Sequence, residues 1–224
     1  MTDSVLGIDL GTSSLKAILY CQCGTTQKVR EKYDQNNPSE WKKALFRALE
    51  KIDCSAVSAV GLSSQVGTYV VNDETVLPWN NKVGSEELKM LKARYSEECF
   101  IKEISMPHPD IPSYPLPRLA YIKENVQEIR SVCQPKDLLC EILTGRRVSD
   151  KYSFRGLCNM ETGEYSRFFL SELSLSPDIL PPLCEVGESV GYITEELCKR
   201  FGLGQIQRYI RDLMIFMLHC SVWE

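Results

Sequence analysis

The sequence predicts an α/β fold, and three observations carry this prediction. Short apolar runs that are typical of buried strands lie at residues 4–10 and 57–62, each bounded by turn-forming residues. An alternating, β-rich run at 15–20 follows the first strand closely enough to return as a hairpin. Helical spacing of apolar residues appears at 38–52 and dominates the later part of the chain. This mixed order of strands and helices indicates α/β or α+β organisation.

The first half of the chain carries most of the expected strands. Residues 24–37 are polar, and we expect a loop with a third strand there. The first helix begins at Pro38, and its apolar residues recur at helical spacing: Trp41, Leu45, Leu49 and Ile52. Short extended pieces are predicted at 69–71 and 76–79, on either side of a polar Asn-Asp-Glu turn.

The second half is predicted to be mainly helical. Five prolines within residues 106–117 require a loop. An apolar helical tail is expected at 214–222. The other helical segments are residues 86–95, 118–125, 126–132, 136–144, 168–175 and 194–201.

Composition excludes several classes of protein. The chain has 224 residues, of which 43% are hydrophobic, and a net charge of −4 without a basic block, so we expect no nucleic-acid partner. No 18-residue apolar run and no signal-peptide pattern occur, which argues against a membrane partner. Ten scattered cysteines with only two histidines do not resemble a zinc site. We therefore expect reduced thiols in a cytoplasmic protein.

The run GIDLGTSSLK at residues 7–16 is the strongest candidate for chemistry. An acidic residue ends a buried strand, and a glycine allows a ligand to approach the backbone of the turn that follows. Hydroxyl and backbone N–H groups there suit phosphate oxygens, and a carboxylate suits Mg²⁺. The candidate phosphate- and Mg²⁺-binding residues are Asp9, Gly11, Thr12, Ser13, Ser14 and Lys16, with Asp9 as the metal ligand. Spacing alone leaves a plain hairpin turn open as the alternative.

This run resembles the first phosphate motif of the actin, Hsp70 and sugar-kinase superfamily, and more narrowly that of the FGGY carbohydrate kinases. Further motifs resemble the family in the same order over about residues 4–203. They are PSEW at 38–41, GLSSQ at 61–65, PWNN at 78–81, PRLAYIKEN at 117–125, PKDL at 135–138, LTG at 143–145, SDKYS at 149–153 and the run 175–191.

The resemblance implies a ribonuclease-H-like fold, in which a mixed sheet is flanked by helices. It implies two such domains around a cleft, the first binding most of the sugar and the second most of the adenosine. Residues 1–224 are then expected to be the N-terminal sugar-binding domain, with the ATP-binding domain absent and 205–224 a divergent tail. The implied reaction is phosphoryl transfer from ATP, with Mg²⁺, to a hydroxyl of a sugar or polyol.

The implied sugar site departs from the family pattern. Residues 65–68 read QVGT where xylulokinase-like members carry QMHG and glycerol kinases QRET. Asn81 replaces the family's aspartate, and Val83 an expected arginine, so the identity of the sugar cannot be transferred. Amide and indole donors suit hydroxyls, which leaves Gln65, Trp79 and Asn81 as expected sugar contacts. A purely structural Trp79 stays open.

The family's catalytic base is an aspartate that follows a glycine pair. In this chain Ile210 and Arg211 stand where the glycines are expected, and Asp212 follows them. Our hypothesis is that Asp212 is the catalytic general base in an altered local sequence. The alternative is a surface aspartate in a divergent tail.

Two further function classes are weighed against a kinase. A catalytically incomplete fragment that binds a sugar or a partner is favoured by the altered 65–68 segment, while the intact phosphate turn argues against it. A sugar-sensing repressor is weaker, because no basic helix-turn-helix opens the chain. An acetate kinase is weaker, because the ordered L-P-P and G-x-x-x-G run favours the sugar kinases. The expected partners are a sugar or polyol and ATP, with a homodimer left open.

Overall fold

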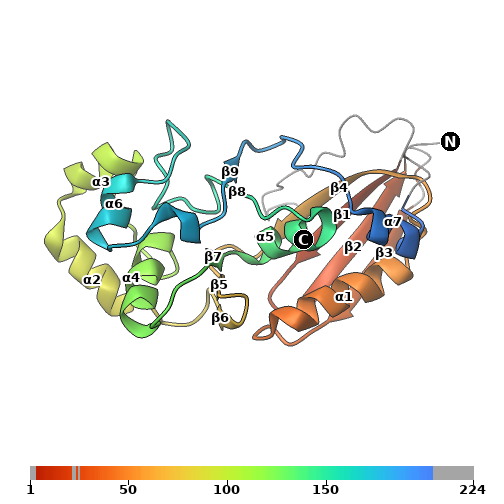
Figure 1. Cartoon of the computed structure of the whole chain (residues 1–224), viewed down its shortest axis with the longest axis horizontal. Helices are drawn as coiled ribbons and strands as arrows, with labels where there is room; N and C mark the ends of the chain where they lie inside the picture. Colours follow the sequence, from red (N-terminus) through yellow and green to blue (C-terminus); the bar gives the residue numbers. More distant parts are fainter. Residues whose placement is uncertain (1–3, 22–23, 25, 204–224) are drawn as a thin grey trace. The chain divides into compact units, whose positions relative to one another are not determined.

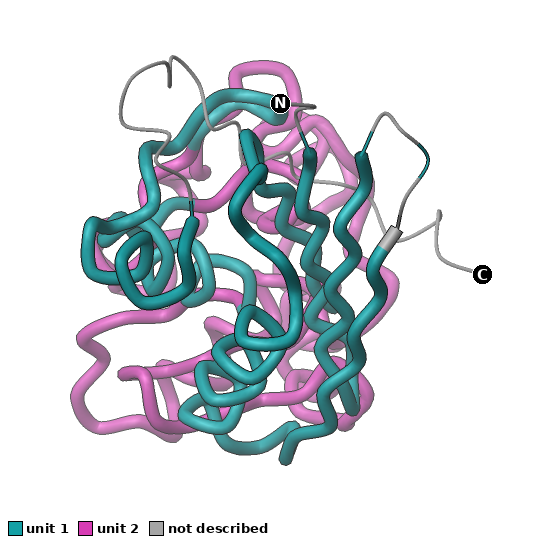
Figure 2. The backbone as a smooth tube through the Cα atoms, turned by 90° about the vertical axis from the view of Figure 1, so that its right-hand side faces the viewer, with its two compact units in different colours: residues 1–65, 135–148, 184–224 teal, residues 66–134, 149–183 magenta. Residues whose placement is uncertain are grey.

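A computed structural model describes residues 4–21, 24 and 26–203. The chain divides into two compact units (Figure 2). Unit 1 is formed by residues 1–65, 135–148 and 184–224. Unit 2 is formed by residues 66–134 and 149–183. Each unit is therefore assembled from segments that are distant in the sequence.

Unit 1 is built on a four-stranded mixed sheet with the order β3-β2-β1-β4. Strands β1 (Ser4–Leu10), β2 (Ser14–Cys21) and β3 (Thr26–Lys32) form an antiparallel meander. Strand β4 (Val57–Ser64) is parallel to β1, and helix α1 (Pro38–Glu50) lies in the connection between β3 and β4. A parallel neighbour requires such a crossover, whereas the hairpin needs only a turn.

Helix α1 covers the sheet with one apolar face (Figure 1). Asn37 caps its N-terminus by accepting a hydrogen bond from the Ser39 backbone N–H, and Pro38 occupies the first turn, where its missing N–H costs little. The buried residues of α1 are Trp41, Ala44, Leu45, Ala48 and Leu49. Unit 1 also contains the helices α5 (Pro135–Thr144) and α7 (Glu195–Phe201).

Unit 2 is mainly helical around a small sheet of order β6-β5-β7. The strands are β5 (Tyr69–Val71), β6 (Thr75–Leu77) and β7 (Val132–Cys133). The helices are α2 (Ser85–Arg94), α3 (Glu97–Ile104), α4 (Pro115–Asn125), α6 (Arg167–Glu172) and the 3-10 turn Pro177–Ile179. A two-stranded ladder joins β8 (Ser149–Asp150) to β9 (Leu183–Cys184). The core is rich in aromatic residues, including Tyr69, Phe100, Phe154 and Phe169.

The predicted α/β class is confirmed, and most predicted elements are present. The helix predicted at 126–132 is wrong, because this segment is not helical and its end forms β7, which pairs with β5. The Asn72 side chain accepts hydrogen bonds from the backbone N–H groups of Arg130 and Ser131, so tertiary pairing overrides local propensity. Helix α3 was not predicted, although Ser96 caps it.

The cysteines and the membrane prediction can be compared with the structure directly. Cys21 is disulfide-bonded, so the expectation of reduced thiols is wrong for this residue, since a disulfide depends on sulfur positions that spacing does not give. Among the described residues, the free thiols are Cys54, Cys99, Cys133, Cys140, Cys158, Cys184 and Cys198. Within the described part of the chain, no helix has the length and apolar character needed to cross a membrane.

Candidate functional site

The turn between β1 and β2 holds the residues predicted to bind phosphate. Asp9 lies at the penultimate position of β1, opposite Lys16 of β2 and beside Ser63 of the parallel strand β4. The backbone N–H of Gly11 donates to the Ser14 carbonyl at 3.1 Å and closes the turn. A Cβ at Gly11 would lie 3.3 Å from that carbonyl oxygen, which is tighter than an ordinary contact. Glycine therefore suits the close approach of the two chain segments.

Two side chains from neighbouring segments hold this turn in place. The Tyr33 hydroxyl donates a short hydrogen bond to the carbonyl of Gly11. Arg30 of β3 donates through Nε to the Ser14 hydroxyl at 2.9 Å. Burial, and to a smaller extent the charge of Asp9, raises the pKa of the Tyr33 phenol, so the hydroxyl stays protonated as a donor. The sequence prediction assigned no role to Tyr33 or Arg30.

The turn offers donors without an acidic cluster. Ser13 is exposed and Thr12 is half-buried, whereas Ser14 is buried with its hydroxyl oxygen accepting from Arg30. In the described part of the chain, no group of three or more His, Cys, Asp or Glu side chains could hold a metal ion. A lone carboxylate at Asp9 fits Mg²⁺, because this ion usually keeps several waters and takes its other ligands from substrate phosphates.

Gln65 lies at the same end of the sheet as the turn. Its backbone N–H donates to the Leu10 carbonyl at 3.1 Å, which extends the pairing of β1 and β4 by one residue. Its side-chain oxygen Oε1 is buried, and among the described residues no donor reaches it. An unpartnered buried amide oxygen is costly, so a hydroxyl or N–H group of a ligand would stabilise this position.

Trp79 and Asn81 lie in unit 2, in the loop after β6. The Trp79 side chain is 45% exposed, and its backbone N–H donates to the Thr68 hydroxyl at 3.1 Å. Thr68 is fully buried, so it positions the Trp79 backbone from within. The Asn81 amide oxygen accepts from Arg118 of α4 at 2.6 Å. The half-exposed indole of Trp79 does not behave as a core side chain.

Arg118 is a buried cation that the sequence prediction missed. Its side chain is fully buried, and it also donates to the Pro78 carbonyl at 2.9 Å. Among the described residues it bonds only neutral acceptors, which lie on both sides of Trp79 in the chain. Burial lowers the pKa of Arg118. The run 117–125 contained this arginine, but no pattern marked it as buried.

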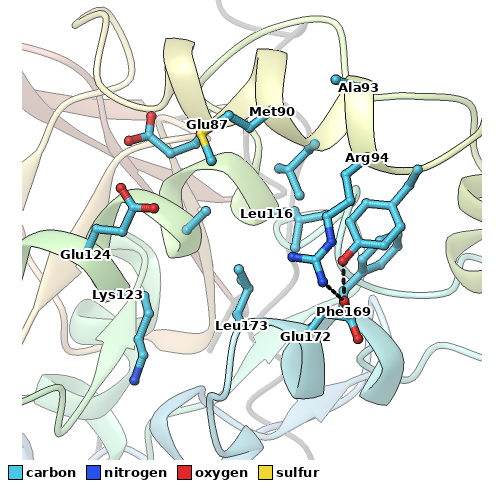
Figure 3. Close-up of a pocket in the computed structure, with 13 residues that line it drawn as sticks. Glu87, Met90, Ala93, Arg94, Leu116, Lys123, Glu124, Phe169, Glu172 and Leu173 are labelled. Atoms are coloured by element: carbon cyan, nitrogen blue, oxygen red, sulfur yellow. Dashed lines mark hydrogen bonds and ion pairs between the residues drawn. The ribbon is translucent and has the colours of Figure 1, made fainter.

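A pocket of about 530 Å³ lies among helices α2, α4 and α6 (Figure 3). Its wall includes Leu116, Phe169 and Leu173, which are apolar. On one side, Arg94 and the Tyr95 hydroxyl both bond Glu172 at 2.5 Å, so these polar groups are engaged with one another. The charged residues Glu87, Lys123 and Glu124 also line this pocket, but none of the residues predicted to contact phosphate or sugar does.

The predicted catalytic residue Asp212 lies outside the described residues, as does the predicted tail at 205–224. Asp150, which lies in the SDKYS run at 149–153, is buried and holds a turn. Its carboxylate accepts from the Tyr152 and Ser153 backbone N–H groups and from the Ser153 hydroxyl at 2.9 Å. This carboxylate therefore has a structural role in the loop.

The fold and the turn define a class of protein, the ribonuclease-H-like α/β proteins of the actin and sugar-kinase type. Comparison with known proteins specifies the family. The chain matches the N-terminal domain of the FGGY family of carbohydrate kinases over residues 4–207, and it belongs to this family.

Individual relatives are similar over most of this chain. The xylulose kinases of Lactococcus lactis and Escherichia coli are each 26% identical, over 89% and 90% of the chain and over 45% and 46% of their own lengths. The chain thus spans about half the length of these relatives. The Plasmodium falciparum glycerol kinase structure with ADP superposes with a TM-score of 0.76 at 14% identity, covering 96% of this chain and 48% of that one, which supports the fold.

Proposed function

We propose that this chain is the sugar-binding half of an ATP-dependent carbohydrate kinase, which phosphorylates a hydroxyl of a sugar or polyol in the cytoplasm. The observation that carries the proposal is the end of the unit 1 sheet. There the Asp9 carboxylate and the turn at 11–14 lie at the same end as the unpartnered amide oxygen of Gln65. Phosphoryl transfer depends mainly on positioning and charge neutralisation, and these groups suit both tasks.

Each residue has a proposed role. Asp9 would hold Mg²⁺ directly or through water, and Lys16 adds a positive charge on the neighbouring strand. The backbone and hydroxyl groups of residues 11–14 would bind phosphate oxygens, with Tyr33 holding the Gly11 carbonyl in place. When bound, ATP would supply the phosphoryl group, and Mg²⁺ would offset part of the negative charge on its oxygens. Gln65, Trp79 and Asn81 are the proposed sugar contacts, although the Asn81 amide oxygen already accepts from Arg118.

Asp212 is proposed as the general base that takes the proton of the sugar hydroxyl. The test is Asp212→Asn in a protein that carries this chain followed by an ATP-binding domain. Loss of the base should lower kcat about 10²- to 10⁴-fold with little change in sugar binding. Retained activity would show that another group is the base.

Sugar binding is tested by thermal shift of the chain with ketoses, pentitols, glycerol and sugar acids. A ligand that binds the folded state must raise Tm by mass action. A shift with one class supports the proposal, and no shift with any class from a folded sample contradicts it.

A binding protein without catalysis is the second candidate. It is favoured by the altered 65–68 segment. Thr68 in this segment is fully buried, and its hydroxyl accepts from the Trp79 backbone N–H, which gives Thr68 a structural role. Titration with Mg-ATP distinguishes the two, because a pure sugar or partner binder has no use for the turn at 11–14. Binding that Asp9→Asn abolishes would favour the kinase.

A further inference from the structure

A small pocket in unit 2 has walls suited to a compact polar ligand. Its volume is about 140 Å³, well below the volume of typical drug-sized sites. Trp79 and Tyr114 contribute aromatic walls, and Ser113 contributes a hydroxyl group. Aromatic rings with a few hydrogen-bonding groups are the usual lining for a small amphipathic ligand. The dimensions and the lining both favour a molecule of the size of a monosaccharide.

Two glycines keep these walls close together. A Cβ at Gly156 would lie 2.4 Å from Cδ1 of Tyr114, so the ring packs directly on the backbone there. A Cβ at Gly67 would lie 3.1 Å from the Cβ, carbonyl oxygen and Oγ of Ser113. The Tyr69 hydroxyl also donates to the Ser113 carbonyl at 3.4 Å. The pocket is therefore held by tight packing and has a defined shape.

Arg155 gives this pocket its charge. In the described part of the chain, no acidic side chain lines the pocket and no carboxylate pairs with Arg155. Its guanidinium carbon lies 5.3 Å from the centroid of the Tyr114 ring, which places the cation beside an aromatic wall. An exposed guanidinium presents a planar set of donors that matches carboxylate and phosphate oxygens.

The neighbourhood of Trp79 is also positive. Arg118 bonds the carbonyl of Pro78 and the side chain of Asn81, which flank Trp79, and among the described residues it has no carboxylate partner. Asn81 is a neutral amide whose oxygen accepts from Arg118, so it adds no negative charge beside Trp79.

We propose that this pocket takes a sugar acid, with its carboxylate paired with Arg155 and its carbon chain against Trp79 and Tyr114. This inference rests on the proposed function and names the class of its substrate. Arg155 is then a residue that determines specificity, since it favours an acidic sugar over a neutral ketose or polyol of similar size.

The test is isothermal titration calorimetry of the chain with D-gluconate, D-glucitol and D-xylulose at equal ionic strength. D-Glucitol has the same number of carbons as D-gluconate without its charge. We expect D-gluconate to bind about tenfold or more tightly than either neutral compound, since a charge-assisted pair has that effect on affinity. Arg155→Gln should remove this advantage and leave D-glucitol binding within about twofold, because only the ion pair is lost.

Two variants control for folding and for general charge. Arg155→Lys keeps the charge without the planar donors, so its affinity for D-gluconate should be intermediate. Arg130→Gln removes an exposed arginine of unit 2 that lies outside this pocket and should change nothing.

The outcomes separate this inference from the proposed function. Tighter binding of D-xylulose or D-glucitol, or D-gluconate binding that Arg155→Gln leaves unchanged, would overturn the sugar-acid inference and leave the kinase proposal standing. If a folded chain binds none of D-gluconate, D-glucitol and D-xylulose, the sugar-acid inference is overturned. If the thermal-shift screen with ketoses, pentitols, glycerol and sugar acids also shows no binding, the proposed function is contradicted as well.

Discussion

The phosphate turn of unit 1 and the small pocket of unit 2 are built in different ways. The turn lies within one hairpin, and its closing hydrogen bond joins Gly11 to Ser14. The pocket is lined by residues from four separate parts of the chain, around Gly67, Trp79, Tyr114 and Arg155. A local motif keeps its geometry through short-range hydrogen bonds, whereas an assembled pocket depends on close packing between distant segments.

This difference bears on how each site can change. Few substitutions fit the turn, because a Cβ at Gly11 would lie 3.3 Å from the Ser14 carbonyl oxygen. The pocket can alter its chemistry by single replacements in its walls, which include Val66 and Gly67 of the QVGT segment. Binding specificity is therefore expected to reside in unit 2.

The largest expected effect is on the packing of the pocket. Gly156→Ala places a Cβ 2.4 Å from Cδ1 of Tyr114 in a backbone with φ of +91°. Strain and overpacking together should lower the free energy of unfolding by about 3 kcal/mol, measured by urea denaturation. Gly145→Ala is the matched control, because its φ of +73° carries strain but no atom lies within 4 Å of the added Cβ. Equal losses in the two variants would show that the contact with Tyr114 does not hold the pocket.

Arg118 gives the next largest effect and tests whether a buried cation supports the Trp79 loop. Arg118→Leu removes the donors to the Asn81 amide oxygen and the Pro78 carbonyl, which should lower the free energy of unfolding by about 2 kcal/mol. Tryptophan fluorescence should change as well, since the loop carries a half-exposed indole. Arg118→Lys keeps the charge with fewer donors, so its free energy of unfolding should lie between those of the parent and Arg118→Leu. A variant as stable as the parent would mean that desolvation of the guanidinium cancels its hydrogen bonds.

Much of the fold could be predicted because hydrophobic periodicity reports it directly. Strands β1 and β4 are short and rich in apolar residues, and α1 shows Trp41, Leu45 and Leu49 at helical spacing with a proline in its first turn. The segment 126–132 could not be predicted this way, because its structure depends on the side chain of Asn72, more than fifty residues earlier. The two compact units were also not visible in the sequence, since each combines separate segments.

The candidate site shows the same limit. Asp9 and the turn at 11–14 were predicted because their residue types and spacing are local. Tyr33 and Arg155 were not, because nothing in their own sequence neighbourhood indicates that one reaches Gly11 and the other lines a pocket with Trp79. Arg118 lay within a recognised motif, but burial without a carboxylate partner is a property of the packed structure.

A smaller effect is expected from loosening the phosphate turn. Tyr33→Phe removes the hydrogen bond to the Gly11 carbonyl and should lower the free energy of unfolding by about 1 kcal/mol. Affinity for Mg-ATP should fall more than affinity for the sugar, because Tyr33 contacts the turn. Tyr20→Phe is the control, since that side chain is 56% exposed on the neighbouring strand β2. If Tyr33→Phe behaves like Tyr20→Phe in both measurements, the turn is held by its own backbone alone.

The smallest effect concerns the attachment of α1 to the sheet of unit 1. Glu31 of β3 is buried and bonds Lys51 at 2.5 Å and Arg47 at 3.1 Å, and these hydrogen bonds, that from Lys51 above all, lower its pKa from the ordinary value of 4.5. A lowered pKa in the folded state stabilises the protein above the ordinary value, and this contribution is lost as pH falls through the folded value. Glu31→Gln should therefore lower the free energy of unfolding by about 1 kcal/mol at pH 7, and the difference from the parent should shrink below about pH 4.5.

The control is Glu86→Gln, which removes an exposed ion pair with Lys89 in unit 2. It should lower the free energy of unfolding by only about 0.3 kcal/mol, because water screens such pairs. A Glu31 difference that is constant with pH would show that the carboxylate charge does not fasten α1 to the sheet.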